Sequence, residues 1–201
     1  VLMFTGIVEA MGEITATEDR ETTRTFTVRA PGLAPSLSLG ASISIDGACF
    51  TAVTIDGGDF TVDAIGTTLE RTVAASYAIG TRVNLERPMQ LGARLDGHLV
   101  QGHVDGVGHL VESIKSGEFW LMDFSIPEDV LGLTVKHGSI TLNGVSLTVS
   151  ELPAPGVCRI GVIPFTHEHT NLGILEAGDR INIEGDMIGK YVGRVLASRD
   201  D

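Results

Sequence analysis

The feature that most constrains this chain is an internal duplication. Residues 40–51 read GASISIDGACFT, and a similar segment, HGSITLNGVSLT, occurs 97 positions later at residues 137–148. Two more blocks repeat at almost the same offset: 4–12 matches 100–108, and 80–86 matches 178–184. So steady an offset indicates two domains of similar length, rather than the roughly 20- to 50-residue units of a solenoid.

The duplication divides the 201 residues into two domains and a tail. We predict a first domain at 1–97, a second at 98–186 and a C-terminal helix at 187–201. In the tail, apolar residues recur at helical spacing, and they are Ile188, Tyr191, Val192, Val195 and Leu196. The first half has no counterpart of this helix. The apolar stripe of the helix therefore either caps its own domain or packs against another subunit.

Short alternating segments predict the fold class. Thr25–Arg29, Ser42–Asp46 and Arg82–Glu86 alternate polar and apolar residues, as half-buried strands do. Twenty-five glycines separate such runs. We therefore predict an all-β chain with one closed antiparallel barrel in each half, since closure removes exposed strand edges, followed by the C-terminal α-helix.

Composition excludes several function classes. The net charge of −12 repels polyphosphate, so neither nucleic acid nor an anionic membrane is expected as a partner. No apolar run approaches the roughly 18 residues that span a membrane, and the start lacks a signal-peptide pattern. Cys49 and Cys158 occupy non-equivalent places in the two halves, so no disulfide framework is expected. We therefore expect a cytoplasmic protein.

General catalytic motifs are missing from the sequence. There is no Gly-x-Ser-x-Gly elbow and no P-loop. A metal site could be considered at His98, His103, His167 and His169, but these histidines lack a matching cysteine or carboxylate signature. We therefore predict no metal.

Four segments together carry a family resemblance. They read MFTGIVE at 3–9, GHLVQGHVD at 97–105, NGVSLTV at 143–149 and NIEGDMIGKY at 182–191. In this order, on a duplicated chain, they resemble the riboflavin synthase family, whose members contain lumazine-binding repeats. The resemblance implies two similar six-stranded antiparallel Greek-key β-barrels and a C-terminal α-helix that holds a homotrimer.

The resemblance also implies a transferase reaction, the final step of riboflavin biosynthesis. Two molecules of 6,7-dimethyl-8-ribityllumazine exchange a four-carbon unit and give riboflavin and 5-amino-6-ribitylaminouracil. Both molecules bind in one active site, between the first barrel of one subunit and the second barrel of its neighbour. No cofactor is expected, because the acidic C7 methyl of the substrate supplies the reactive centre. The resemblance also leads us to expect an association with lumazine synthase.

Positions where the two copies differ suggest how two identical substrates come to act differently. Ile7 aligns with His103, Cys49 with Ser146, and Pro88 with Asp186, so proton-transferring groups collect in the second half. His103 is a candidate for proton transfer, because imidazole has an unperturbed pKa of about 6.5. The candidate catalytic residues are His103, Ser146, Cys49, Ser42, Thr148 and Asp186.

These roles have alternatives, and for His103 the alternative is a structural histidine whose hydrogen bonds are satisfied. Ser146 either hydrogen-bonds the substrate ring or positions a water. Cys49 binds or adds to the acceptor substrate, or is only a small buried hydrophobe. Asp186 caps the C-terminal helix or acts in the site. Ser42 aligns with Ser139 and Thr51 with Thr148, so these shared residues are predicted to bind groups common to both substrates.

The resemblance also carries over substrate contacts, residue by residue. In the first barrel they fall on Phe4, Gly6, Ile7, Val8, Cys49, Phe50, Thr51, Asp63, Ala64, Ile65, Gly66, Thr67 and Thr68. In the second barrel they fall on Gly102, His103, Val104, His137, Ser146, Leu147, Thr148, Val162, Ile163, Pro164, Phe165, Thr166 and His167. The alternative is turn geometry for the glycines and barrel core for 162–164.

The chain departs from the family pattern mainly in its first half. Thr67 stands where a glutamate is usual, Phe50 where a leucine is usual, and His137 where a lysine is common. These changes predict altered affinity in the first barrel rather than lost chemistry. Two rival interpretations stay open: a non-catalytic lumazine- or flavin-binding protein of the same fold, and a β-barrel module that binds sugars or proteins.

Overall fold

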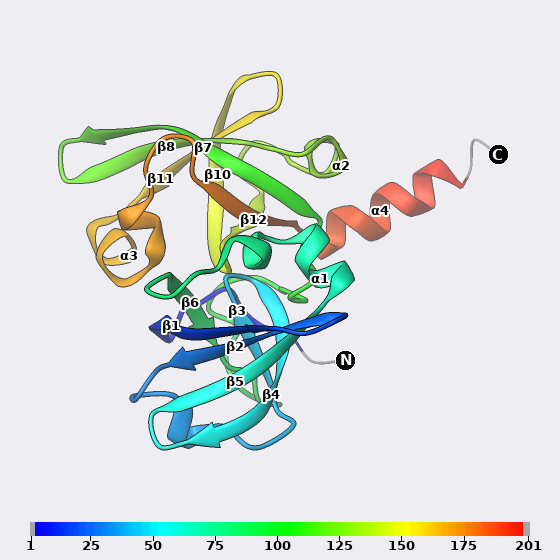
Figure 1. Ribbon diagram of the computed structural model, residues 1–201. Coiled ribbons are helices and arrows are strands. Elements are labelled where there is room, and N and C mark those ends of the chain that lie inside the picture. Colours follow the sequence, from blue (N-terminus) through cyan, green and yellow to red (C-terminus); the bar gives the residue numbers. More distant parts are fainter. Residues whose placement is uncertain (1–2, 199–201) are drawn as a thin grey trace.

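The computed structural model describes residues 3–198. Residues 1, 2 and 199–201 lie outside the described part, so the ends of the predicted first domain and of the predicted tail helix fall there. Between these limits the chain forms two barrels stacked end to end, with one helix projecting from the second (Figure 1).

The first half forms a closed antiparallel barrel in the order β1-β2-β5-β4-β3-β6. Its strands are β1 (Ala10–Asp19), β2 (Thr23–Arg29), β3 (Ser42–Ile45), β4 (Ala48–Asp56), β5 (Asp59–Ile65) and β6 (Arg82–Glu86). Neighbours β2 and β5 are not consecutive in the chain, which is the Greek-key crossover. Alternation sorts the side chains, so that in β5 Phe60 and Val62 are buried in the core.

The second half repeats this topology strand for strand in the order β10-β11-β8-β7-β12-β9. Its strands are β7 (Gly106–Ser116), β8 (Phe119–Ser125), β9 (Ser139–Leu142), β10 (Val145–Ala154), β11 (Val157–Val162) and β12 (Arg180–Gly185). Each barrel has its own apolar core. The predicted all-β fold of two similar six-stranded barrels followed by a helix is confirmed.

Helices are short except for the last. The α-helices are α1 (Gly66–Arg71), α2 (Glu128–Leu131), α3 (Pro164–His169) and α4 (Met187–Ala197), and the 3₁₀ turns are Ala34–Ser36, Val73–Ser76 and Asn171–Ile174. Helices α1 and α3 occupy equivalent places, directly after β5 and β11. No helix among residues 3–198 is long and apolar enough to cross a membrane.

Helix α4 projects away from both barrels and buries none of its side chains (Figure 1). Asp186 caps its first turn, accepting a 2.9 Å hydrogen bond from Ile188 N. The predicted apolar stripe lies exposed along the helix and consists of Ile188, Tyr191, Val192, Val195 and Leu196. Of the two alternatives for this stripe, capping its own domain is therefore wrong.

Two equivalent hairpin turns join the barrels. Asp46-Gly47 connects β3 to β4 and Asn143-Gly144 connects β9 to β10, and all four residues have positive φ, as a two-residue type I′ turn requires. A Cβ added to Gly47 would lie 2.7 Å from Gly144 N, and the reverse approach is also 2.7 Å. The turns therefore meet back to back, and only glycine fits at either position.

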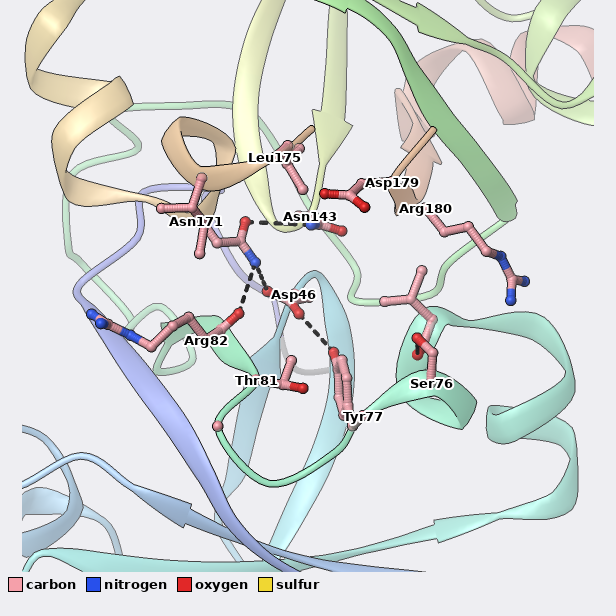
Figure 2. A pocket seen from close by; sticks show the side chains of 13 residues that line it. Asp46, Ser76, Tyr77, Thr81, Arg82, Asn143, Asn171, Leu175, Asp179 and Arg180 are labelled. Atoms are coloured by element: carbon pink, nitrogen blue, oxygen red, sulfur yellow. Dashed lines mark hydrogen bonds between the residues drawn. The ribbon is translucent and has the colours of Figure 1, made fainter. Parts of the chain in front are cut away.

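A buried polar network surrounds these turns (Figure 2). The Asp46 carboxylate accepts hydrogen bonds from Asn84 N, Asn171 Nδ2 and Tyr77 Oη at 2.7, 2.9 and 2.8 Å. Its counterpart Asn143 accepts one from Asn182 N at 2.8 Å. The network joins both barrels, and burial raises the pKa of Asp46 to about 7.

Candidate functional site

The segments that precede the two barrels, residues 4–8 and 100–104, are exchanged: each lies against the barrel of the other half. Ser146 of the second barrel donates its backbone N–H to Gly6 O at 2.7 Å, and Cys49 of the first donates to Gly102 O at 2.8 Å. The prediction that 6–8 lines the first pocket and 102–104 the second is therefore wrong. Each segment lies against the barrel formed by the other half of the chain.

Contacts on either side of this crossing confirm the exchange. Phe4 and Val100, which are equivalent positions, pair as an isolated antiparallel bridge between the two segments. Beyond it, Val104 packs in the core of the first barrel and Val8 packs against that of the second. A Cβ on Gly102 would lie 2.8 Å from Cys49 Cβ, so this glycine permits the close approach.

Two buried carboxylates hold the exchanged segments. Glu86, at the end of β6, accepts hydrogen bonds from Thr5 N, Thr5 Oγ1 and Gly6 N at 2.6, 2.7 and 2.9 Å. Its counterpart Glu184, in β12, accepts from Gln101 N at 2.8 Å and His103 N at 3.0 Å. Burial raises the pKa of Glu86, and it raises that of Glu184 to about 7.

The first site is a cavity of about 580 Å³ at the junction of the barrels. Its lining comes from β4, α1 and the exchanged segment, and includes Cys49, Thr67, Thr68, Gly102, His103 and Val104. The exchange therefore brings His103 beside Cys49 rather than Ser146. The alignment of the two halves suggested that proton-transferring groups collect in the second barrel. The exchange instead places His103 at the first.

The Cys49 thiol is half-buried, and this burial raises its pKa, although a hydrogen bond from Ser42 acts in the opposite direction. A raised pKa keeps the group a neutral thiol at neutral pH. Cys49 is therefore suited to contact with an uncharged ring rather than to nucleophilic attack. Ser42 itself is nearly buried and lines a neighbouring hollow beside Arg87.

The second site centres on Ser146, whose hydroxyl is 2.7 Å from His98 Nδ1. The other ring nitrogen of His98, Nε2, is 3.1 Å from Thr141 Oγ1. Burial lowers the pKa of His98, while the charge of Asp186 acts in the opposite direction. A neutral imidazole thus connects two hydroxyls, one donating and one accepting according to its tautomer.

Helix α3 occupies in the second barrel the place that α1, which lines the first cavity, occupies in the first. His167 stacks on Trp120 of β8 with ring centroids 3.7 Å apart, and Phe165 stacks on His169 at 4.1 Å. Phe165 and Ile163 are 65% and 58% exposed, so a flat apolar surface faces solvent here. Such a surface suits a planar aromatic ligand.

The structure separates the remaining predicted contacts into three groups. Phe4, Phe50, Ala64, Val104 and Val162 are buried core residues. Asp63 lies on the outer face of β5, where it accepts a 2.6 Å hydrogen bond from Thr25 Oγ1, away from the Cys49 cavity.

The third group is more exposed and lies on or beside the strands and helices of the two sites. Its members are Ile7, Thr51, Ile65, Gly66, His137, Leu147, Thr148, Pro164 and Thr166. His137 has φ of 66° at the position equivalent to Gly40, whose φ is 77°. Thr148 pairs with Ser139 as Thr51 pairs with Ser42, so the shared residues occupy matching places in the two barrels.

Sequence reasoning missed three residues that build the sites. Glu86 and Glu184 close the repeated block at 80–86 and 178–184, and a carboxylate kept in both copies was the available signal. His98 was considered only as a metal ligand, although it directly follows Gly97 at the start of a family motif. Within residues 3–198 no cluster of three or more potential metal ligands occurs.

Comparison with known proteins agrees with this geometry. The lumazine binding domain family matches twice, at residues 5–88 and 101–186. LumP is similar in structure: its complex with 6,7-dimethyl-8-(1'-D-ribityl) lumazine gives a TM-score of 0.82 at 25% identity, and its riboflavin complex 0.85 at 26%, each covering 91% of this chain and 99% of LumP. Two lumazine binding domains, joined by exchanged segments, define the class of this protein.

The sequence relatives are more specific. The riboflavin synthase of Mycobacterium tuberculosis (strain ATCC 25618 / H37Rv) is 41% identical over 199 residues, which cover 98% of this chain and 99% of that protein. The chain belongs to the riboflavin synthase family.

Proposed function

We propose that this chain catalyses the riboflavin synthase reaction, in which two 6,7-dimethyl-8-ribityllumazine molecules give riboflavin and 5-amino-6-ribitylaminouracil. The observation that carries the proposal is a pair of equivalent sites, at Cys49 and Ser146, each built from one barrel and a segment of the other half. A reaction between two copies of one substrate gains chiefly from proximity and orientation, which two like sites supply.

The direct test uses the substrate alone. Purified chain incubated with 6,7-dimethyl-8-ribityllumazine should form riboflavin and the pyrimidine product in equal amounts, without added cofactor or metal. Chromatography with absorbance detection measures both products. Tight binding of the lumazine without turnover would instead support the rival function of a ligand carrier. The structural similarity to LumP, which was solved in complex with this lumazine, is the reason to test for it.

Replacing His103 by alanine should lower kcat. His103 lines the first cavity and is exposed, so it is placed to exchange protons with a bound ring. Loss of a general acid–base group is expected to reduce kcat about 100-fold. His109→Ala is the matched control, because this histidine is exposed on β7 and its ring hydrogen-bonds Ser125, outside the first cavity. Equal turnover of His103→Ala and the unaltered chain would remove His103 from the mechanism.

We further infer a homotrimer, in which the first barrel of one subunit faces the second barrel of the next. Support comes from the apolar stripe of α4, whose five side chains are all more than half exposed in the single chain. Exposed apolar stripes of this kind mark protein interfaces. A cytoplasmic location and an association with lumazine synthase remain expectations from the family resemblance.

Val192→Glu should convert the assembly to monomers. Val192 lies at the centre of the α4 stripe and is 52% exposed, so the charge is tolerated in the free chain but not in an apolar interface. Sedimentation equilibrium measures the mass. Arg194→Glu, a charge change on another face of the same helix, should leave the mass unchanged. A Val192→Glu protein of unaltered mass would exclude α4 from the interface.

A further inference from the structure

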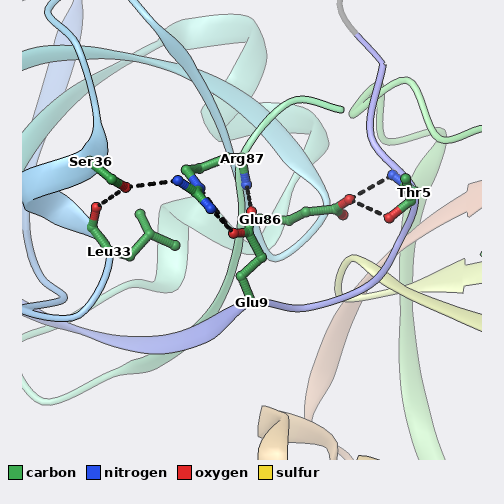
Figure 3. Close-up of polar contacts among 6 residues, drawn as sticks. All are labelled: Thr5, Glu9, Leu33, Ser36, Glu86 and Arg87. Carbon is green, nitrogen blue, oxygen red and sulfur yellow. Dashed lines mark hydrogen bonds and ion pairs between the residues drawn. The ribbon is translucent and has the colours of Figure 1, made fainter. Parts of the chain in front are cut away.

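The two exchanged segments are each fixed at their far end by an ion pair, and the two pairs differ in origin. In the first half, Arg87 Nη2 lies 2.6 Å from Glu9 Oε2, and Arg87 N donates to Glu9 Oε1 at 2.7 Å (Figure 3). Both residues belong to the first barrel and its leading segment. This first pair is therefore independent of the C-terminal helix.

The second pair comes from the C-terminal helix. Lys190 of α4 places Nζ 2.7 Å from Oδ2 of Asp105, which is equivalent to Glu9. Both side chains are only about one-fifth exposed, at 21% and 23%. The same Asp105 oxygen accepts Gly185 N at 2.8 Å, and Asp105 N donates to Ile183 O at 2.9 Å. The helix is thus tied to the segment through Asp105.

This segment carries His103 into the first cavity. Glu184 holds it from one side through Gln101 N and His103 N, and Asp105 closes its end on β12. The charge of Glu184 also reaches Cys49, whose pKa it raises. The charge of Lys190 lowers the pKa of Glu184, and the charge of Asp105 raises it. Asp105 lies two residues from His103 and is itself part of the lining of the first cavity, so the ion pair with Lys190 stands at the edge of the site.

We propose that Lys190 is a positioning residue for the reaction: its ion pair with Asp105 holds His103 in the first cavity and links that placement to helix α4. The proposal rests on the proposed function and on the proposed role of His103. It makes the second ion pair an assembly-dependent contact, because the exposed face of the same helix is the inferred subunit interface. Glu9 and Arg87 give the first half no such dependence.

Lys190→Met should lower kcat about tenfold and leave KM within about twofold, because small displacements of a reacting group cost rate more than affinity. Lys190→Arg should restore kcat to within about twofold, since Arg87 already makes the equivalent bond in the first half. Arg194→Met, one turn further along α4 and exposed, is the matched control and should keep the original kcat.

Two further measurements separate positioning from assembly and from general activity. Asp105→Asn removes the charge without altering the helix, and it should reproduce the loss of kcat in an assembly of unchanged mass. The NMR resonance of the His103 ring, assigned with His103→Ala, should shift in Lys190→Met and not in Arg194→Met. This readout needs no turnover, so an inactive parent chain would count against the proposed function alone.

Three results would overturn the proposal. The first is an unchanged His103 resonance in Lys190→Met. The second is Asp105→Asn with the kcat of the unaltered chain. The third is failure of Lys190→Arg to recover the activity that Lys190→Met has lost.

Discussion

Gly102→Ala is expected to destabilise the protein by about 3 kcal/mol or more and to abolish ligand binding in the first cavity. Gly102 has φ of 76°, where a Cβ is strained, and that Cβ would lie 2.8 Å from Cys49 Cβ and 2.9 Å from Phe4 Cε2. Neither neighbour has room to move, because Phe4 is fully buried and Cys49 is fixed in β4. The segment must therefore separate from the first barrel.

Gly40→Ala is the matched control for this substitution. Gly40 has almost the same φ, 77°, but nothing lies within 4 Å of its added Cβ. Backbone strain alone is expected to cost about 1–2 kcal/mol there, and the equivalent position already holds His137. Urea titration measures both variants, and fluorescence titration with riboflavin measures binding. Equal destabilisation by the two substitutions would contradict the close approach of Gly102 to Cys49.

Asp46→Asn is expected to stabilise the protein by roughly 4 kcal/mol near pH 8, because each tenfold change in proton affinity corresponds to about 1.4 kcal/mol. Burial raises the pKa of Asp46 from 3.8 to about 7. A carboxyl with a raised pKa contributes its stability fully below pH 3.8, and this contribution is lost as pH rises through about 7. An asparagine amide does not ionise, so its contribution to stability does not change as pH rises.

The geometry indicates that asparagine fits at position 46. Its oxygen can accept from Asn84 N and Asn171 Nδ2, and its NH₂ can donate to Tyr77 Oη, which reverses the bond that Tyr77 now donates. The equivalent residue of the second barrel, Asn143, already occupies the same type of turn. No buried polar atom need lose its partner.

Denaturant unfolding between pH 4 and pH 8 tests this prediction. The free energy of unfolding should fall less steeply with rising pH in Asp46→Asn than in the unaltered chain, with a residual slope from Glu184, whose pKa is about 7, and from Glu86, whose pKa is also raised. Asp179→Asn is the control, because this carboxylate is exposed, whereas that of Asp46 is buried. An unchanged slope in Asp46→Asn would show that Asp46 does not titrate there.

Local sequence signals predicted the elements well, because each depends on neighbouring residues. Alternation identified the strands, and Asp186 directly before an apolar stripe marked the start of α4. The same local logic orders the run from Asp63 to Thr68 that the family resemblance carries over as substrate contacts. Alternation along β5 places Asp63 on the outer face, whereas Thr67 and Thr68 line the Cys49 cavity.

The duplication by itself determined that the chain has two like barrels, two like turns and two like sites, because similar sequences fold into similar local structures. It did not determine which leading segment completes which site. Segments 4–8 and 100–104 are nearly equivalent, so their local preferences are equally compatible with either barrel. Only the tertiary structure decided this, through the back-to-back turns, the Phe4–Val100 bridge and the glycines that allow close approach. These contacts place His103 beside Cys49 and leave Ser146 with His98.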